Sequence, residues 1–316
     1  MTAVARPSTL PAAAAGLALE RVGCNLCGGR DLALMYRKPD TRHWTSPQEF
    51  DAVRCRGCGL GFVNPRPSRQ SMATFYPPRF YERRRVEEER GRYARQAGYL
   101  DGLAPGRVLD IGCAGGAFLQ VLAERGWEPF GMDLFESGND HGFPLRYGDL
   151  LALAYPGDQF DAVTAWAVFE HLHDPAAYFR EVGRILRPGG RFVCLVTNLR
   201  SVWSRFAYGE DIPRHLYFYS AATLRRYAAQ SGLWVREIAC ATEIFPPDSS
   251  DVFRVRLLRA LGYGWPEIHG RAAPLAPAVR ALARVARLLG VALTRPRLEA
   301  RLGLGGIVVA TMEKPR

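Results

Sequence analysis

The sequence predicts an α/β chain built on a seven-stranded, mostly parallel sheet with helices on both faces. The main observation is that apolar, strand-like segments alternate with segments of helical periodicity from residue 107 onward. This alternation favours a parallel sheet, because each crossover places a helix on one of the two faces. The expected strands lie in RVLDIG, EPFGMDL, LRYGDLLAL, FDAVTAW, RFVCLVTN, WVREIAC and GIVVATMEK. The expected helices lie in AFLQVLAERG, DPAAYFREVGRIL and SAATLRRYAAQSGL.

A second observation is that four early cysteines form two pairs, Cys24-Asn-Leu-Cys27 and Cys55-Arg-Gly-Cys58, each followed directly by glycine. A two-residue gap lets both thiolates of a pair face one metal ion, and the glycine permits a tight turn around the sulfurs. We therefore predict a zinc-ribbon-like module with a structural zinc ion. The alternative is a redox-active pair, but such a pair opens a helix in a βαβ unit, and that setting is absent here.

Clusters of residues that interrupt helices and strands, together with changes in composition, suggest the boundaries between the other parts of the chain. Asn-Pro-Arg-Pro-Ser at 64–68 ends the module in this interpretation. We expect five parts: a disordered tail (1–20), the zinc-ribbon-like module (21–68), a helical linker or cap (69–104), the α/β core (105–245 and 306–316), and a helical insertion before the last strand (246–305). The tail lacks the pattern of a signal peptide, so a cytoplasmic location is expected.

The glycine-rich turn in VLDIGCAGGAFL, residues 108–119, follows a predicted strand and opens a predicted helix. As a dinucleotide fingerprint it is weak, because Ala114 and Ala117 replace two glycines of G-x-G-x-x-G. As D-x-G-x-A-x-G, it opens the backbone to a flat nucleoside and puts Asp110 beneath a positively charged ligand. Asp133 closes the next strand and can accept both ribose hydroxyls in either case. These features alone leave both ligand classes open.

Further segments carry a resemblance to a known family. VLDIGCAGG, GMD, GDL, FDAVTAWAVFEHLHDP and RILRPGG resemble the class I S-adenosylmethionine-dependent methyltransferases of the small-molecule type. CNLCGG…VRCRGCGLGFVNPRPS and HLYFYSAATLRRYAAQSGL resemble a subgroup with an N-terminal zinc-ribbon-like module, many of whose members act on sugars, lipids or specialised metabolites. The resemblance implies a Rossmann-like core, S-adenosyl-L-methionine as cofactor and S-adenosyl-L-homocysteine as product.

The resemblance also implies a cofactor site at the ends of the first four strands of the core. In it, Asp133 takes the ribose hydroxyls and Leu134 packs on the adenine. Asp149 with Leu150 reads the adenine edge. The full set of expected cofactor residues is Asp110, Gly112, Ala114, Gly116, Asp133, Leu134, Asp149, Leu150, Ala165 and Trp166. The expected metal ligands are Cys24, Cys27, Cys55 and Cys58.

Histidines near the carboxyl ends of the strands are the candidates for a general base. A hydroxyl acceptor needs a base, whereas an amine often does not, and orientation alone can supply much of the acceleration. His215 lies among Tyr208, Tyr217, Phe218 and Tyr219, an expected aromatic wall for a partly apolar acceptor. His171 follows the fourth strand and is the second candidate. For both, a purely structural role is the alternative.

The predicted insertion is basic and amphipathic. In PAVRALARVARLLG, Val279, Leu282, Val285 and Leu289 share one helical face, and Arg280, Arg284 and Arg287 occupy another. Residues 248–316 hold twelve Arg or Lys against five Asp or Glu. Three interpretations stay open: a lid or homodimer surface, a peripheral membrane contact, and attraction of an anionic acceptor.

The expected activity is methyl transfer to a small-molecule acceptor, most readily to a hydroxyl oxygen of a sugar, lipid or specialised metabolite. The net charge of +11 keeps an RNA methyltransferase as an alternative. Against it, AWAVFEHLHDP follows the fourth strand in place of an element that holds an extruded nucleobase. A non-catalytic protein that only binds S-adenosylmethionine is the other alternative, and an NAD-dependent oxidoreductase is more remote.

Overall fold

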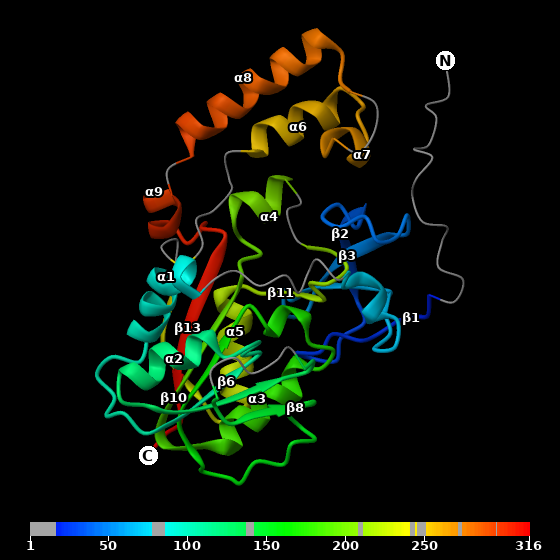
Figure 1. The fold of residues 1–316 in the computed structure, drawn as a ribbon. Coiled ribbons are helices and arrows are strands. Elements are labelled where there is room, and N and C mark those ends of the chain that lie inside the picture. The colour runs from blue at the N-terminus through cyan, green and yellow to red at the C-terminus, as the bar shows by residue number, and fades with distance from the viewer. Residues whose placement is uncertain are drawn as a thin grey trace.

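The computed structural model describes residues 17–77, 86–136, 142–207, 211–240, 244, 251–270, 274–294 and 296–316. Most of the predicted tail, together with Phe80, Tyr81, His141 and Tyr208, lies outside the described residues. Three parts follow one another in Figure 1: a small sheet near the N-terminus, a central sheet layered with helices, and a group of helices above it. None of the described helices is long and apolar enough to cross a bilayer.

The central sheet has seven strands in the order β12-β13-β10-β9-β6-β7-β8. Their bounds are β6 (Arg107–Ile111), β7 (Glu128–Asp133), β8 (Leu145–Tyr147), β9 (Phe160–Trp166), β10 (Leu186–Thr197), β12 (Trp234–Ala239) and β13 (Ile307–Glu313). β13 pairs antiparallel with both β10 and β12, and the other pairings are parallel. The predicted seven-stranded, mostly parallel sheet is therefore confirmed.

Helices cover both faces of this sheet because alternate side chains of each strand point to opposite faces. Val108 of β6 packs in one apolar cluster with α1 (Val86–Gly98) and α2 (Ala117–Glu124). Its neighbour Leu109 packs in the other, with α3 (Pro175–Ile185) and α5 (Ala221–Gln230). Asp174 caps α3, since its carboxylate accepts a hydrogen bond from the backbone N–H of Ala177 at 3.1 Å.

The N-terminal module is joined to the core by a shared sheet. Its strands are β1 (Leu19–Glu20), β2 (Leu32–Pro39), β3 (Glu49–Cys55), β4 (Gly61–Val63) and β5 (Arg66–Pro67), followed by the short 3-10 helix η1 (Met72–Phe75). β4 pairs antiparallel with β11 (Tyr217–Phe218), which comes from the distant segment between β10 and α5. Side chains of the module also belong to the same apolar cluster as the α3 and α5 face of the central sheet.

The helices between β12 and β13 form a separate layer. They are α6 (Val252–Ala260), α7 (Trp265–Ile268), α8 (Pro277–Leu293) and α9 (Pro296–Arg301). α6 lies between α8 and α4 (Val202–Ala207), and α8 is the outermost of the three in Figure 1. Their buried side chains make a small cluster of their own, which includes Val255, Leu258 and Trp265 of the insertion and Trp44 of the module.

Candidate functional site: a nucleoside crevice beside a histidine pair

The four N-terminal cysteines converge although two strands separate the pairs. Sγ of Cys24 lies 3.3 Å from Sγ of Cys58, and Sγ of Cys27 lies 3.6 Å from Sγ of Cys55. All four sulfurs lie within 4.8 Å of one another. A tetrahedral zinc ion with Zn–S bonds of about 2.3 Å places its sulfurs about 3.8 Å apart. The donor set and its spacing therefore fit one zinc ion, with no coordination position left for a substrate.

The loop after β6 is shaped by left-handed backbone conformations. Gly112, Ala114 and Gly116 have φ values of 77°, 47° and 86°. A Cβ atom at position 112 would lie 2.5 Å from Cγ2 of Val168, so only glycine allows the loop to approach the chain beyond β9 this closely. Ala114 adopts its unusual conformation in spite of its methyl group. The alternating turns expose the backbone of Gly112 and Ala114 at the carboxyl end of β6.

Asp133 at the end of β7 holds this loop in place. Its two carboxylate oxygens accept hydrogen bonds from the backbone N–H groups of Ala114, at 2.9 Å, and Phe135, at 3.1 Å. A carboxylate has about four lone-pair positions, so Asp133 keeps the capacity to accept from two further hydroxyls. Leu134 beside it is 49% exposed and available to a flat ring.

Asp110 gives the crevice a second acidic group. Its buried carboxylate accepts a hydrogen bond from Oγ1 of Thr164 at 2.6 Å. Burial, assisted by repulsion from the negative charge of Asp133, raises the pKa of Asp110 to about 7. A cation placed between these two carboxylates would relieve that repulsion, so the electrostatics of the crevice favour a positively charged ligand.

The other predicted cofactor residues lie at the neighbouring strand ends and differ in exposure. Asp149 accepts from the backbone N–H of Leu151 at 3.0 Å and forms an ion pair with Arg69 at 3.0 Å. Leu150 and Ala165 are fully buried, so their side chains support the crevice from below. Trp166 packs edge-on against Phe118, and its indole N–H is buried without a hydrogen-bond partner.

The two predicted catalytic histidines lie side by side although 43 residues separate them. Their ring centroids are 4.8 Å apart in an edge-to-face arrangement. The contact arises because the backbone N–H of Leu216 donates to the carbonyl of Glu170 at 2.6 Å, which aligns the segment 211–216 with the short 3-10 helix η3 (Phe169–His171) after β9. This places His215 at the carboxyl end of a central strand.

The two rings differ in their hydrogen bonds. Nδ1 of His171 lies 3.0 Å from the carbonyl oxygen of Arg214, which only accepts, so Nδ1 carries the proton of the neutral ring. Burial lowers the pKa of His171 to about 3. In His215, Nδ1 accepts from the backbone N–H of Asp211 at 3.4 Å, a long contact. The carboxylate of Asp211 lies close enough to the His215 ring for the two groups to interact electrostatically.

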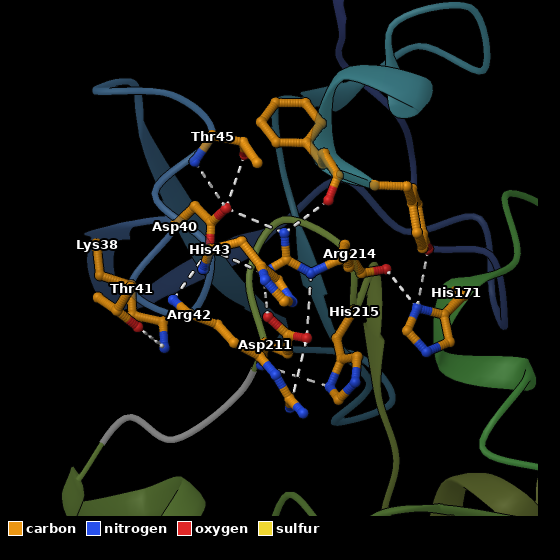
Figure 2. A network of polar contacts seen from close by, with 12 residues as sticks. Lys38, Asp40, Thr41, Arg42, His43, Thr45, His171, Asp211, Arg214 and His215 are labelled. Carbon is orange, nitrogen blue, oxygen red and sulfur yellow. Dashed lines mark hydrogen bonds and ion pairs between the residues drawn. The ribbon is translucent and has the colours of Figure 1, made fainter. Parts of the chain in front are cut away.

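A buried ion network connects His215 to the N-terminal module (Figure 2). Arg214 is fully buried and donates to both carboxylate oxygens of Asp40, at 2.7 and 3.0 Å. The same guanidinium pairs with Asp211 and donates to the carbonyl of Phe75 at 2.8 Å. Its positive charge holds the pKa of both carboxylates below the usual range, to about 2 for Asp211. The network holds the segment directly before His215, at Asp211 and Arg214.

The residues of this network are the part of the site that sequence reasoning missed. Asp40 and Arg214 are 174 positions apart, and no spacing rule links them. The Arg-His dipeptide at 214–215 was the one available signal. The expected aromatic wall is wrong for its described members: Tyr217, Phe218 and Tyr219 are buried in the core. All three belong to the apolar cluster that the module shares with the central sheet, where β11 completes the sheet of the module.

A hollow of about 500 Å³ lies elsewhere, between the module and the core. Arg66, Arg69 and His173 are among the residues that line it. His173 precedes the start of α3, and its Nε2 lies 3.1 Å from the carbonyl oxygen of Pro67. The hollow is therefore part of the junction between the two units.

Comparison with known proteins agrees with this geometry. The family model described as a methyltransferase domain matches residues 81–238, half of the chain. The chain is 30% identical over 159 residues to a protein of Aeromonas salmonicida named ubiquinone biosynthesis O-methyltransferase, a match that covers 44% of this chain and 67% of the relative. A protein of the same name from Thiobacillus denitrificans is 33% identical over 162 residues, with 44% and 69% covered.

Among solved structures, a SAM-dependent methyltransferase from Archaeoglobus fulgidus is similar at 20% identity and a TM-score of 0.46, over 73% of this chain and 95% of that one. The family match covers the sheet from before β6 to the end of β12, and so includes the crevice and both histidines. The chain belongs to the methyltransferase domain family and is an S-adenosylmethionine-dependent methyltransferase.

Proposed function

We propose that the protein transfers a methyl group to a hydroxyl oxygen of a small-molecule acceptor. The observation that carries this proposal is the position of His215, next to a carboxylate and at the end of the strand that borders the crevice. A hydroxyl acceptor must lose its proton to a base, and His215 is the base that an acceptor would meet at this position. The names of the two relatives, both O-methyltransferases, support the same choice of acceptor atom.

The crevice residues fit S-adenosylmethionine. Asp133 would take the ribose hydroxyls with its free lone pairs, and exposed Leu134 would pack on the adenine. Gly112 and Ala114 expose backbone beside the position of the methionine portion. When bound, the cofactor supplies an activated methyl group on a positively charged sulfur. Asp110 and Asp133 together provide the negative potential that this charge requires.

His215 would take the proton of the acceptor hydroxyl at Nδ1. The N–H of Asp211 holds that lone pair only loosely at 3.4 Å. Once protonated, the ring is stabilised by the Asp211 carboxylate, whose position is fixed by Arg214. His171 stays neutral and limits the movement of the His215 ring by edge-to-face contact. Such a base contributes about 10²–10⁴-fold to the rate.

The cysteine cluster is proposed to hold a structural zinc ion. The four thiolates would fill all its coordination positions, so the ion would take no part in methyl transfer. Its contribution would be to hold the two cysteine-bearing turns together, and through β3 and β4 to support β11 and the segment that carries His215.

The cofactor site is tested with Asp133→Ala and the control Asp158→Ala, which removes an exposed carboxylate paired with Lys314. We expect Asp133→Ala to weaken S-adenosylmethionine binding at least about 100-fold by calorimetry, because a charge-assisted hydrogen-bond pair is lost. The control should bind normally. Wild-type affinity in a folded Asp133→Ala variant would contradict the site assignment.

The base is tested with His215→Asn and an acceptor identified by release of S-adenosylhomocysteine. We expect kcat to fall about 10²–10⁴-fold while the affinity for S-adenosylmethionine changes little. Unchanged turnover would reduce His215 to a structural residue. If S-adenosylmethionine binds but no acceptor hydroxyl is ever methylated, the protein is a binding protein and the proposed reaction is wrong.

A further inference from the structure

Helix α8 presents an exposed apolar surface that its packing leaves uncovered. Its 17 residues contact α6 through small side chains, and Ala283, Ala286 and Gly290 are its buried positions. The larger apolar side chains face away. Each of six is more than half exposed: Leu282, Val285, Leu288, Leu289, Val291 and Leu293. Three of the four residues of the predicted apolar stripe, Leu282, Val285 and Leu289, are thus exposed, whereas the fourth, Val279, packs against the cluster formed with α6 and α7.

Five of these six side chains lie on one side of the helix, and the sixth, Val291, lies between Arg280 and Arg284. At about 100° per residue, the arc from Leu288 to Leu293 spans about 140° and contains no polar residue of the helix. Arg280, Arg284 and Arg287 lie together beside this arc, and all three are exposed. The helix therefore presents an apolar strip with a row of guanidinium groups along its edge.

The charge of the surrounding sequence has one sign. Six arginines and no acidic residue occur between Glu267 and Glu299. A second copy of the same helix would bring arginines against arginines. The helix is about 25 Å long and about 10–12 Å wide, so its footprint is roughly 250–300 Å². A stable protein–protein interface needs about 800 Å² from each partner. Both points disfavour a dimer through α8.

We propose that α8 lies on the surface of an anionic lipid bilayer. Its apolar arc would enter the boundary between headgroups and acyl chains, and its arginines would contact the anionic headgroups. α8 lies at the outer edge of the molecule, with α6 beneath it and the central sheet below (Figure 1), and the side chains of its apolar arc are exposed. The proposal is independent of the reaction assigned to the crevice.

The test is sedimentation of the full chain with vesicles of phosphatidylcholine, alone or mixed with phosphatidylglycerol. We expect binding to the mixed vesicles, weakened by salt, and little binding to phosphatidylcholine alone. Leu289→Ser should lower the partition coefficient about tenfold, the effect of one leucine withdrawn from an apolar phase. Leu34→Ser, a change at a leucine of β2 with similar exposure, should leave it unchanged.

A charge-matched pair of variants separates the arginine row from net charge. Arg280→Gln/Arg284→Gln/Arg287→Gln should remove the preference for phosphatidylglycerol, whereas Arg54→Gln/Arg225→Gln/Arg226→Gln, at exposed positions elsewhere, should keep most of it. Equal loss in both triple variants would overturn the proposal. So would failure of the full chain to sediment with the mixed vesicles, binding to RNA without binding to vesicles, or a dimer that Leu289→Ser dissociates.

Discussion

The N-terminal cysteine module and the helical insertion are both additions to the same central sheet, yet they are attached in different ways. The module shares an apolar cluster with the sheet, contributes three strands to a four-stranded sheet completed by β11, and reaches His215 through Arg214. The insertion has a small cluster of its own and leaves large apolar side chains on its outer helix exposed. The whole module precedes the family match, and the insertion follows it.

This difference indicates different tasks. A unit that shares a core with the sheet and fixes the backbone beside a candidate base cannot move without disturbing the site. The insertion packs its outer helix through alanine and glycine and exposes its leucines. These leucines can contact a surface outside the chain without disturbing the packing of the core. Three predictions test this contrast, from the largest expected effect to the smallest.

Breaking the metal cluster should have the largest effect. Cys24→Ser removes a buried thiolate from the proposed zinc site. Structural zinc contributes on the order of 10 kcal/mol in small modules, and here the module shares its core with the sheet. We expect loss of bound zinc by elemental analysis and a fall in Tm of roughly 10 °C or more for the whole chain.

Cys240→Ser is the matched control, because Cys240 is half-buried and lies outside the cluster. It should retain zinc and melt within a few degrees of the wild type. A Cys24→Ser protein that purifies without metal and melts like the wild type would remove the structural role of the ion.

Removing one charge of the buried network should have the next largest effect. Asp40→Asn leaves Arg214 with one of its two carboxylate partners. Breaking a buried ion pair in this way costs about 3–5 kcal/mol, measurable by denaturant unfolding. We also expect kcat to fall while cofactor affinity is kept, since Asp40 acts on His215 only through Arg214.

Asp51→Asn, at the surface pair with Arg37 in the same module, is the control. It should lower the free energy of unfolding by less than about 1 kcal/mol. Equal losses for Asp40→Asn and Asp51→Asn would show that the module is not tied to the site through this network.

Changing the exposed face of the insertion should have the smallest effect on folding. Leu289→Ser alters a side chain that is 51% exposed, so the free energy of unfolding should change by less than about 0.5 kcal/mol. Denaturant unfolding of the variant checks this. A loss of 2 kcal/mol or more would mean that this face of α8 is covered within the folded protein. The insertion would then not differ from the module in the way proposed.

The central sheet could be predicted from the sequence because each of its strands is marked by a pattern within a few consecutive residues. Each strand is a short apolar run bounded by breakers, and the glycine turn, Asp133 and the cysteine pairs follow spacing rules. The origin of the fourth strand of the module could not be predicted in this way. β11 is two residues long and pairs with a strand more than 150 positions earlier in the chain. Without that pairing, the sequence around Tyr217 and Phe218 is equally typical of an aromatic wall of a ligand site.

The sequence by itself determined the fold class, the cysteine ligand set and the acidic residues at the strand ends, since these depend on periodicity and on side-chain chemistry within short windows. The tertiary structure alone decided that His171 and His215 lie side by side, that Arg214 ties the module to the site through Asp40, and which face of α8 stays uncovered. The first two depend on contacts between residues 43 and 174 positions apart. Such contacts are fixed by the packing of the whole chain, because no local pattern specifies a partner at that distance.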